Sequence, residues 1–108
     1  MDISIVIPNF NGAKLLEKNI PKVFDSLKEY TQKTKTKGEV IIVDDASSDS
    51  SVSVIKKLCT KYSDLIFLEN ERNFGFSSTI NKGVKHAKGD IVILFNSDVI
   101  PEKIACNF

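Results

Sequence analysis

Four short apolar runs, separated by segments with helical periodicity, constrain the fold of this 108-residue chain more than any other feature. The runs are ISIVI, EVIIVD, LIFLE and DIVILF, at residues 3–7, 39–44, 65–69 and 90–95. Their lengths and their β-branched residues favour strands. The last run is unbroken from Ile91 to Phe95 and then meets NSD, a pattern typical of a strand buried on both faces. Strands of that kind belong to parallel sheets covered by helices.

Apolar residues at helical spacing fill the three intervals. They predict helices over residues 15–30, 49–62 and 76–89, with Phe76, Ile80, Val84 and Ala87 as the buried face of the third. Pro21 predicts a kink or a restarted helix, because proline lacks a backbone N–H. Ser47, Ser48 and Asp49 are candidate N-terminal caps of the second helix, and Gly89 is the candidate C-terminal end of the third. Residues 31–39 are polar and are predicted to form a solvated loop. The βαβαβαβ order predicts an α/β fold with right-handed crossovers.

Charge and cysteine content argue against several functional classes. With 15 Lys and Arg against 14 Asp and Glu, the composition gives no indication of a nucleic acid or an anionic membrane as partner. Cys59 and Cys106 form no CxxC pattern, which argues against a zinc site or a disulfide framework. No apolar run approaches the roughly 20 residues of a membrane span. We therefore expect a cytoplasmic protein, and membrane association through further sequence stays open.

Polar clusters follow all four predicted strands: PNFNG, DDASSDSS, NERNFGF and NSD. The carboxyl ends of parallel strands share one edge, where open α/β sheets bind nucleotides. PNFNGAK matches neither a P-loop nor the dinucleotide pattern GxGxxG, so a bound diphosphate needs another source of positive charge. Mg²⁺ or Mn²⁺ held by Asp98 is one such source, and a helix cap is the alternative role for Asp98.

Four segments, SIVIPNFNG, EVIIVDDASSDSS, NFGFSSTINKG and GDIVILFNSDV, follow one another in this order and spacing, and the likeness they carry extends over nearly all of residues 2–102. Together they resemble the N-terminal, nucleotide-sugar-binding half of family 2 glycosyltransferases, which have the GT-A fold, and rhamnosyltransferase-like members are the most similar. The resemblance implies a three-layer α/β/α, nucleotide-diphospho-sugar transferase-like fold. It also implies sugar transfer with inversion from a nucleotide-diphosphate donor to an acceptor hydroxyl, in polysaccharide or glycoconjugate synthesis. The implied partners are a UDP- or dTDP-sugar and a glycan or lipid-linked acceptor.

The resemblance also assigns site residues. Asp45 falls where a carboxylate meets the imide N–H of uracil or thymine, a proton that cytosine lacks; guanine is a further candidate base. NSD stands where many members of the family have DxD, so Asp98 is the remaining metal ligand. Turn and cap chemistry is the alternative role for Asp44 and Asp45, and an ordinary Asn-x-Gly turn for Asn73 and Gly75. The implied nucleotide-binding residues are Pro8, Phe10, Asn11, Asp45, Asn73, Gly75, Asn96 and Ser97.

We expect residues 1–108 to be a truncated domain, with the acceptor-binding half and the general base downstream. Such a chain binds a donor but does not transfer sugar by itself. We expect a four-stranded sheet in the order 3-2-1-4, with an exposed edge beyond the fourth strand through which the chain could self-associate. The alternative functions are a nucleotidyltransferase and a non-catalytic nucleotide-binding or assembly module.

Overall fold

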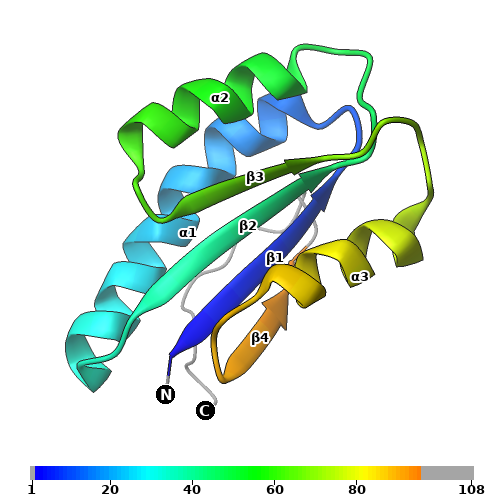
Figure 1. The fold of residues 1–108 in the computed structure, drawn as a ribbon. Helices are drawn as coiled ribbons and strands as arrows, with labels where there is room; N and C mark the ends of the chain where they lie inside the picture. The colour runs from blue at the N-terminus through cyan, green and yellow to red at the C-terminus, as the bar shows by residue number, and fades with distance from the viewer. Residues whose placement is uncertain (1, 96–108) are drawn as a thin grey trace.

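The computed structural model describes residues 2–95, which form a parallel sheet with three helices. In chain order the elements are β1 (Ile3–Asn9), α1 (Ala13–Thr34), β2 (Gly38–Asp44), α2 (Ser51–Lys61), β3 (Leu65–Glu69), α3 (Phe76–His86) and β4 (Ile91–Leu94) (Figure 1). Every strand pairing is parallel and the strand order is β3-β2-β1-β4. The predicted alternation and strand order are therefore confirmed.

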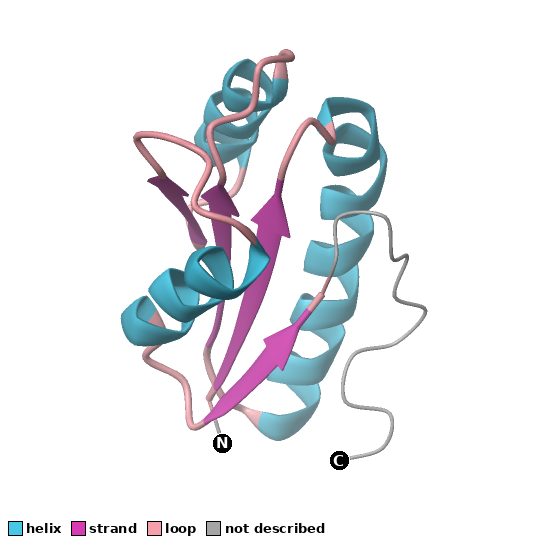
Figure 2. Cartoon of the chain, turned by 90° about the vertical axis from the view of Figure 1, so that its right-hand side faces the viewer, coloured by secondary structure: helices cyan, strands magenta, loops and turns pink. Residues whose placement is uncertain are grey.

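Helices cover both faces of the sheet, so the predicted three layers are confirmed (Figures 1 and 2). On one face, Ile3, Ile5 and Ile7 of β1 pack with apolar residues of α1 and α2 in the larger core cluster. On the other face, Val6 belongs to a smaller cluster that lies under α3. This division follows from the period of two in a strand, which sends successive side chains to opposite faces.

Helix α1 is one continuous helix that passes through Pro21. The predicted restart is therefore wrong. Proline leaves the carbonyl of Glu17 without its usual partner, but the flanking Ile20 and Val23 are both almost completely buried and hold the helix against the sheet. The helix also extends to Thr34, into the predicted loop, and ends with Lys35 in the left-handed region at φ 56°.

The face of α3 that packs on the sheet is not the predicted one. Phe76 and Val84 are 61% and 41% exposed, whereas Thr79 and Gly83 are buried. A Cβ atom at Gly83 would overlap Cγ1 of Val6, so the helix lies too close to the sheet for a larger residue. Helical spacing identified the apolar stripe on α3 correctly. It could not show that the helix packs closely on the sheet and therefore buries the small residues beside that stripe.

Strand β4 was predicted to be buried on both faces, and this prediction is wrong. Ile91 and Ile93 pack against the larger core cluster, but Val92 and Leu94 are 38% and 51% exposed. Within residues 2–95, β4 pairs with β1 alone and α3 lies over β1 and β2. The side of β4 that faces the α3 layer is therefore left open in the described part of the chain.

The start of β4 depends on Gly89, which lies outside α3 and does not end it as predicted. Its N–H donates to Oγ of Ser4 at 2.8 Å, and Ser4 in turn donates to Oε2 of Glu39 at 2.6 Å. A Cβ at Gly89 would lie 2.7 Å from backbone atoms of Ile3 and Ser4. Glycine is needed here because the backbone of the chain passes directly over β1.

None of the helices in this part of the chain combines the length and the apolar character that crossing a bilayer requires.

Candidate functional site

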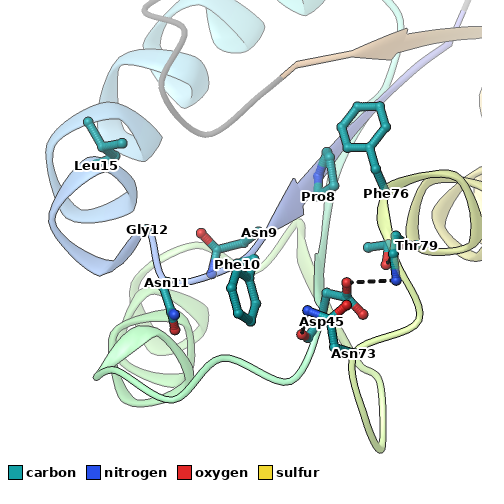
Figure 3. Close-up of a pocket in the computed structure, with 11 residues that line it drawn as sticks. Pro8, Asn9, Phe10, Asn11, Gly12, Leu15, Asp45, Asn73, Phe76 and Thr79 are labelled. Carbon is teal, nitrogen blue, oxygen red and sulfur yellow. Dashed lines mark hydrogen bonds between the residues drawn. The ribbon is translucent and has the colours of Figure 1, made fainter.

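A pocket of about 500 Å³ opens at the carboxyl edge of the sheet, where the chain leaves β1 and β2 and enters α3 (Figure 3). Its volume lies within the range of roughly 300–1,000 Å³ that is typical of small-molecule sites. Residues from three separate segments line it: Pro8, Asn9, Phe10, Asn11, Gly12, Leu15, Asp45, Asn73, Gly75, Phe76 and Thr79.

The pocket brings together most of the residues that the sequence assigned to a nucleotide. Pro8, Phe10, Asn11, Asp45, Asn73 and Gly75 all line it, although up to 67 positions separate them along the chain. Parallel strands explain this, because the ends of β1 and β2 must share an edge. The remaining predicted residues, Asn96, Ser97 and Asp98, lie outside the described residues.

The two adjacent acids after β2 have different roles. Asp44 is fully buried and accepts hydrogen bonds from Nδ2 of Asn9 at 2.9 Å and from both N–H and Oγ of Ser47, at 2.9 and 2.6 Å. These contacts tie the end of β1 to the turn after β2. Asp44 does not line the pocket and has the turn role that was its predicted alternative.

Asp45 is 6% exposed and holds the loop before α3. Its Oδ1 accepts from N–H of Phe74 at 2.8 Å and from Nδ2 of Asn70 at 2.9 Å, and its Oδ2 accepts from N–H of Gly75 at 3.0 Å. Burial opposes ionisation, but the hydrogen bonds from Asn70, Phe74 and Gly75, with a smaller contribution from the Thr79 hydroxyl, outweigh it and lower the pKa of Asp45 below its usual 3.8. The carboxylate is therefore charged at neutral pH.

The hydrogen bonds are distributed unequally over the two oxygens of the Asp45 carboxylate. An ionised carboxylate has about four lone-pair sites, two on each oxygen. Both sites on Oδ1 are taken, and Gly75 takes one on Oδ2. The hydroxyl of neighbouring Thr79 donates to the carbonyl of Gly75 at 2.7 Å. Oδ2 can therefore accept a further hydrogen bond from a ligand in the pocket.

Gly75 is the residue before α3 and has φ 93°, a conformation that strongly favours glycine. This conformation turns the N–H groups of Phe74 and Gly75 toward Asp45 and brings the amino end of α3 to the pocket. The partial positive charge at a helix N-terminus favours anionic groups nearby.

Asn11 has a structural task besides its place in the pocket. Its φ is 54°, and its Oδ1 accepts from the N–H groups of Ser48 and Asp49 at 2.8 and 3.2 Å. Its own N–H donates to Oγ of Ser47 at 2.9 Å. Only the side-chain NH₂ group of Asn11 is left for a ligand, because its oxygen already binds the loop after β2.

Of the three predicted caps of α2, only Asp49 serves that helix. Its Oδ1 accepts from the N–H of Ser51, the first residue of α2, at 2.9 Å. Ser47 and Ser48 bind the loop after β1 instead, so the prediction for these two serines is wrong. Both serines lie three or more residues before the first residue of α2. They therefore face the neighbouring loop rather than the first turn of the helix.

Sequence reasoning missed several residues that line the pocket. Leu15 and Phe76 are partly exposed apolar residues on opposite sides of it, and Phe76 had been assigned to a buried helix face (Figure 3). Asn9 is 2% exposed and its Oδ1 has no hydrogen-bond partner among the described residues. Asn9 and Gly12 lie inside the PNFNG cluster, which was the available signal; nothing in the sequence distinguished Leu15 or Thr79.

The described residues contain no group of three or more His, Cys, Asp or Glu side chains that could hold a metal ion. The carboxylates at this edge, Asp44, Asp45 and Asp49, already accept hydrogen bonds from backbone N–H groups. The predicted ligand, Asp98, is not among the residues described.

Comparison with known proteins agrees with this fold. Residues 4–106 match the model of the family described as glycosyl transferase family 2. A dolichyl-phosphate beta-glucosyltransferase, ALG5D of Trichomonas vaginalis, is 28% identical over 101 residues, which are 89% of this chain and 30% of the relative. The chain thus spans less than a third of the length of the curated relatives it matches.

Two solved structures have the same architecture. The mannosyltransferase PcManGT from Pyrobaculum calidifontis, in complex with GDP-Man and Mn²⁺, superposes with a TM-score of 0.80 at 26% identity, over 91% of this chain and 28% of that one. S. aureus TarS 1–349 in complex with UDP superposes with a TM-score of 0.74 at 25% identity, over 91% and 28% of the two chains. The family model spans nearly the whole sequence and the fold is shared with transferases of nucleotide sugars, so this chain belongs to glycosyl transferase family 2.

Proposed function

We propose that the pocket binds the nucleotide of a nucleoside-diphosphate sugar, and that the protein transfers this sugar with inversion to an acceptor hydroxyl. The observation that carries the proposal is the ionised carboxylate of Asp45, whose Oδ2 accepts one backbone hydrogen bond, in a pocket lined by the aromatic side chains of Phe10 and Phe76. Aromatic walls provide a flat apolar surface for a base, and the carboxylate provides polar recognition of its edge.

The occupied positions on Asp45 favour uracil or thymine as the base. Each of these bases presents one imide N–H, which Oδ2 can accept beside its one backbone hydrogen bond. A guanine edge presents two adjacent donors to a carboxylate and needs a position on each oxygen. Oδ1 already accepts from Asn70 and Phe74 and has no room for a third donor. The UDP bound by TarS supports this preference, and the GDP-Man bound by PcManGT makes guanine the alternative to test.

The remaining parts of the proposal extend beyond residues 2–95. A divalent cation is proposed to bind at Asp98 and to neutralise the diphosphate, supported by the position of NSD in the sequence and the Mn²⁺ in the PcManGT complex. The general base is proposed to lie outside the described pocket, because Asp45 is the only acid that lines it. A lipid-linked or glycan acceptor is supported by the name of the dolichyl-phosphate relative.

Nucleotide titration followed by NMR tests the pocket. UDP and dTDP are expected to bind more tightly than GDP or CDP. Phe10→Ala should weaken UDP binding by about 1–3 kcal/mol, the usual contribution of stacking a base on an aromatic ring. Phe74→Ala is the matched control, since Phe74 is 46% exposed but its side chain does not line the pocket. Equal losses for the two variants, or tighter binding of GDP than of UDP, would contradict the proposal.

A further inference from the structure

Asn70 follows β3 and joins three elements of the fold, although it does not line the pocket. It is 4% exposed. Its N–H donates to the carbonyl of Asp44 at 2.8 Å, and its Nδ2 donates to Oδ1 of Asp45 at 2.9 Å and to Oγ1 of Thr79 at 3.0 Å. Its Oδ1 accepts from Nζ of Lys82 at 3.2 Å. Every hydrogen of Asn70 that can be donated is therefore used.

Lys82 determines which way the amide of Asn70 faces. An ammonium group can only donate hydrogen bonds, so it must meet the oxygen of the amide. The NH₂ group then faces Asp45 and Thr79. The reversed amide would place its oxygen against the carboxylate of Asp45, where two acceptors repel each other. Lys82 is held in place by a second bond, from Nζ to the carbonyl of Glu69 at 3.1 Å.

Asn70 in turn orients the carboxylate of Asp45. Phe74 and Gly75 each supply one backbone N–H, and both belong to the loop that Asp45 itself holds. Of the described side chains, that of Asn73 reaches the backbone carbonyl of Asp45, whereas Nδ2 of Asn70 donates to its carboxylate. It stands at the end of β3, so it anchors the carboxylate to the sheet rather than to the loop. Without it, Oδ1 has a free acceptor position and the carboxylate can rotate.

We propose that Asn70 is a positioning residue for base recognition, and that Lys82 acts through it. By filling Oδ1 from the side of the sheet, Asn70 leaves Oδ2 as the only oxygen that accepts from the ligand. This arrangement determines selectivity for a base with one imide N–H over cytosine, which lacks it. The inference rests on the proposed function, because it requires the base to meet Asp45.

The test compares UDP and CDP, which differ at the atom that Asp45 is proposed to contact. Dissociation constants of both are measured by NMR titration for the parent chain and for Asn70→Ala and Lys82→Met. Asn70→Ala is expected to reduce the preference for UDP over CDP by about three- to tenfold, the effect of losing one hydrogen bond that orients another. Lys82→Met should reduce it less, while binding of CDP stays within about twofold of the parent.

Two control variants accompany these. Lys82→Arg keeps a donor for Oδ1 of Asn70 and should retain the parent preference. Lys85→Met removes a charge from an exposed position on the same helix and should leave both dissociation constants unchanged. In the Asn70→Ala and Lys82→Met variants the pKa of Asp45, followed by carboxyl NMR, should rise, because a hydrogen bond to its charged form is lost or weakened.

The outcomes separate the two proposals. If the parent does not prefer UDP to CDP, Asp45 does not recognise the base, and both the proposed role of Asp45 and this inference are wrong. If the parent prefers UDP and the variants lose affinity for both nucleotides equally, Asn70 only supports the fold and the inference alone is wrong. If Asn70→Ala does not fold, Lys82→Met decides, because Lys82 is partly exposed and methionine keeps most of its stem.

Discussion

The carboxylate of Asp49, in the loop after β2, accepts a hydrogen bond at 3.2 Å from the N–H of Ala13, the first residue of α1. Its other oxygen binds the first N–H of α2, that of Ser51. One side chain therefore serves two helix N-termini, where negative charge is favourable. Neither helix has a cap from its own N-cap side chain. The loops on one side of the pocket are tied together through this contact.

Asp49→Ala should destabilise the fold. Because Asp49 is exposed, we expect a loss near the lower end of the range of about 0.5–2 kcal/mol for removed helix caps. Urea unfolding at pH 7 measures it. Ser50→Ala is the control, since Ser50 occupies the N-cap position of α2 without a side-chain hydrogen bond to the helix. A loss in Ser50→Ala as large as that in Asp49→Ala would show that the capping assignment is wrong.

Stability should fall in acid, in part through Asp45. Its pKa is lowered in the folded protein, since its hydrogen bonds outweigh the effect of burial, so the unfolded chain binds the proton more readily. The stabilisation is present above the unfolded value, near 3.8, and is lost as pH falls through the lower folded value. Asp45→Asn should be less stable than the parent by about 1–3 kcal/mol at pH 7, because an amide NH₂ then faces backbone N–H donors.

Unfolding free energies of the parent and of Asp45→Asn, measured between pH 7 and about pH 2, check this dependence. The difference between the two proteins should shrink as the pH falls. A constant difference across the whole range would mean that the Asp45 carboxylate titrates with the same pKa in the folded and unfolded states.

Gly83→Ala should destabilise α3 even though alanine is the better helix former. The added methyl would overlap Cγ1 of Val6 and lie 3.1 Å from Cγ2 of Val43. We expect a net loss of about 1–3 kcal/mol from overpacking. Val6→Ala in the same chain removes the overlapping atom and should recover part of the loss. A double-mutant cycle by chemical denaturation measures this coupling, and strictly additive effects would contradict the close packing of α3 on β1.

Gly89→Ala should be more disruptive than Gly83→Ala and should not be rescued by trimming a side chain. The new Cβ would meet backbone atoms of Ile3 and Ser4 at 2.7 Å, and backbone cannot rotate away. β4 should separate from β1, which hydrogen exchange would detect as lost protection of the N–H of Phe95, now bonded to the carbonyl of Val6 at 3.0 Å. Lys88→Ala, an exposed neighbour, should retain that protection.

The order of residues alone was enough to predict the alternation of strands and helices. Together with the family resemblance, it also predicted the strand order and the edge of the sheet that carries the site. The length of an apolar run, its β-branched content and helical spacing are local properties of the sequence. They predict the type of each element correctly because each element buries its apolar residues in the folded protein. Parallel strands necessarily end on the same side of a sheet, so the polar clusters could be placed at one edge, and the family resemblance singled out Phe10, Asp45 and Gly75 within them. No side-chain detail was needed for that inference.

Tertiary packing decided which face of each element is buried and what each polar group binds. Periodicity identified a stripe on α3, but the distance between helix and sheet selected Gly83 over Phe76. Asp44 and Asp45 are adjacent and chemically identical, yet only Asp45 lines the pocket, because Asp44 is fully buried against Asn9 and Ser47. Asn70 binds Asp45 across 25 positions, and a contact between residues so far apart exists only once β2, β3 and α3 have been brought together.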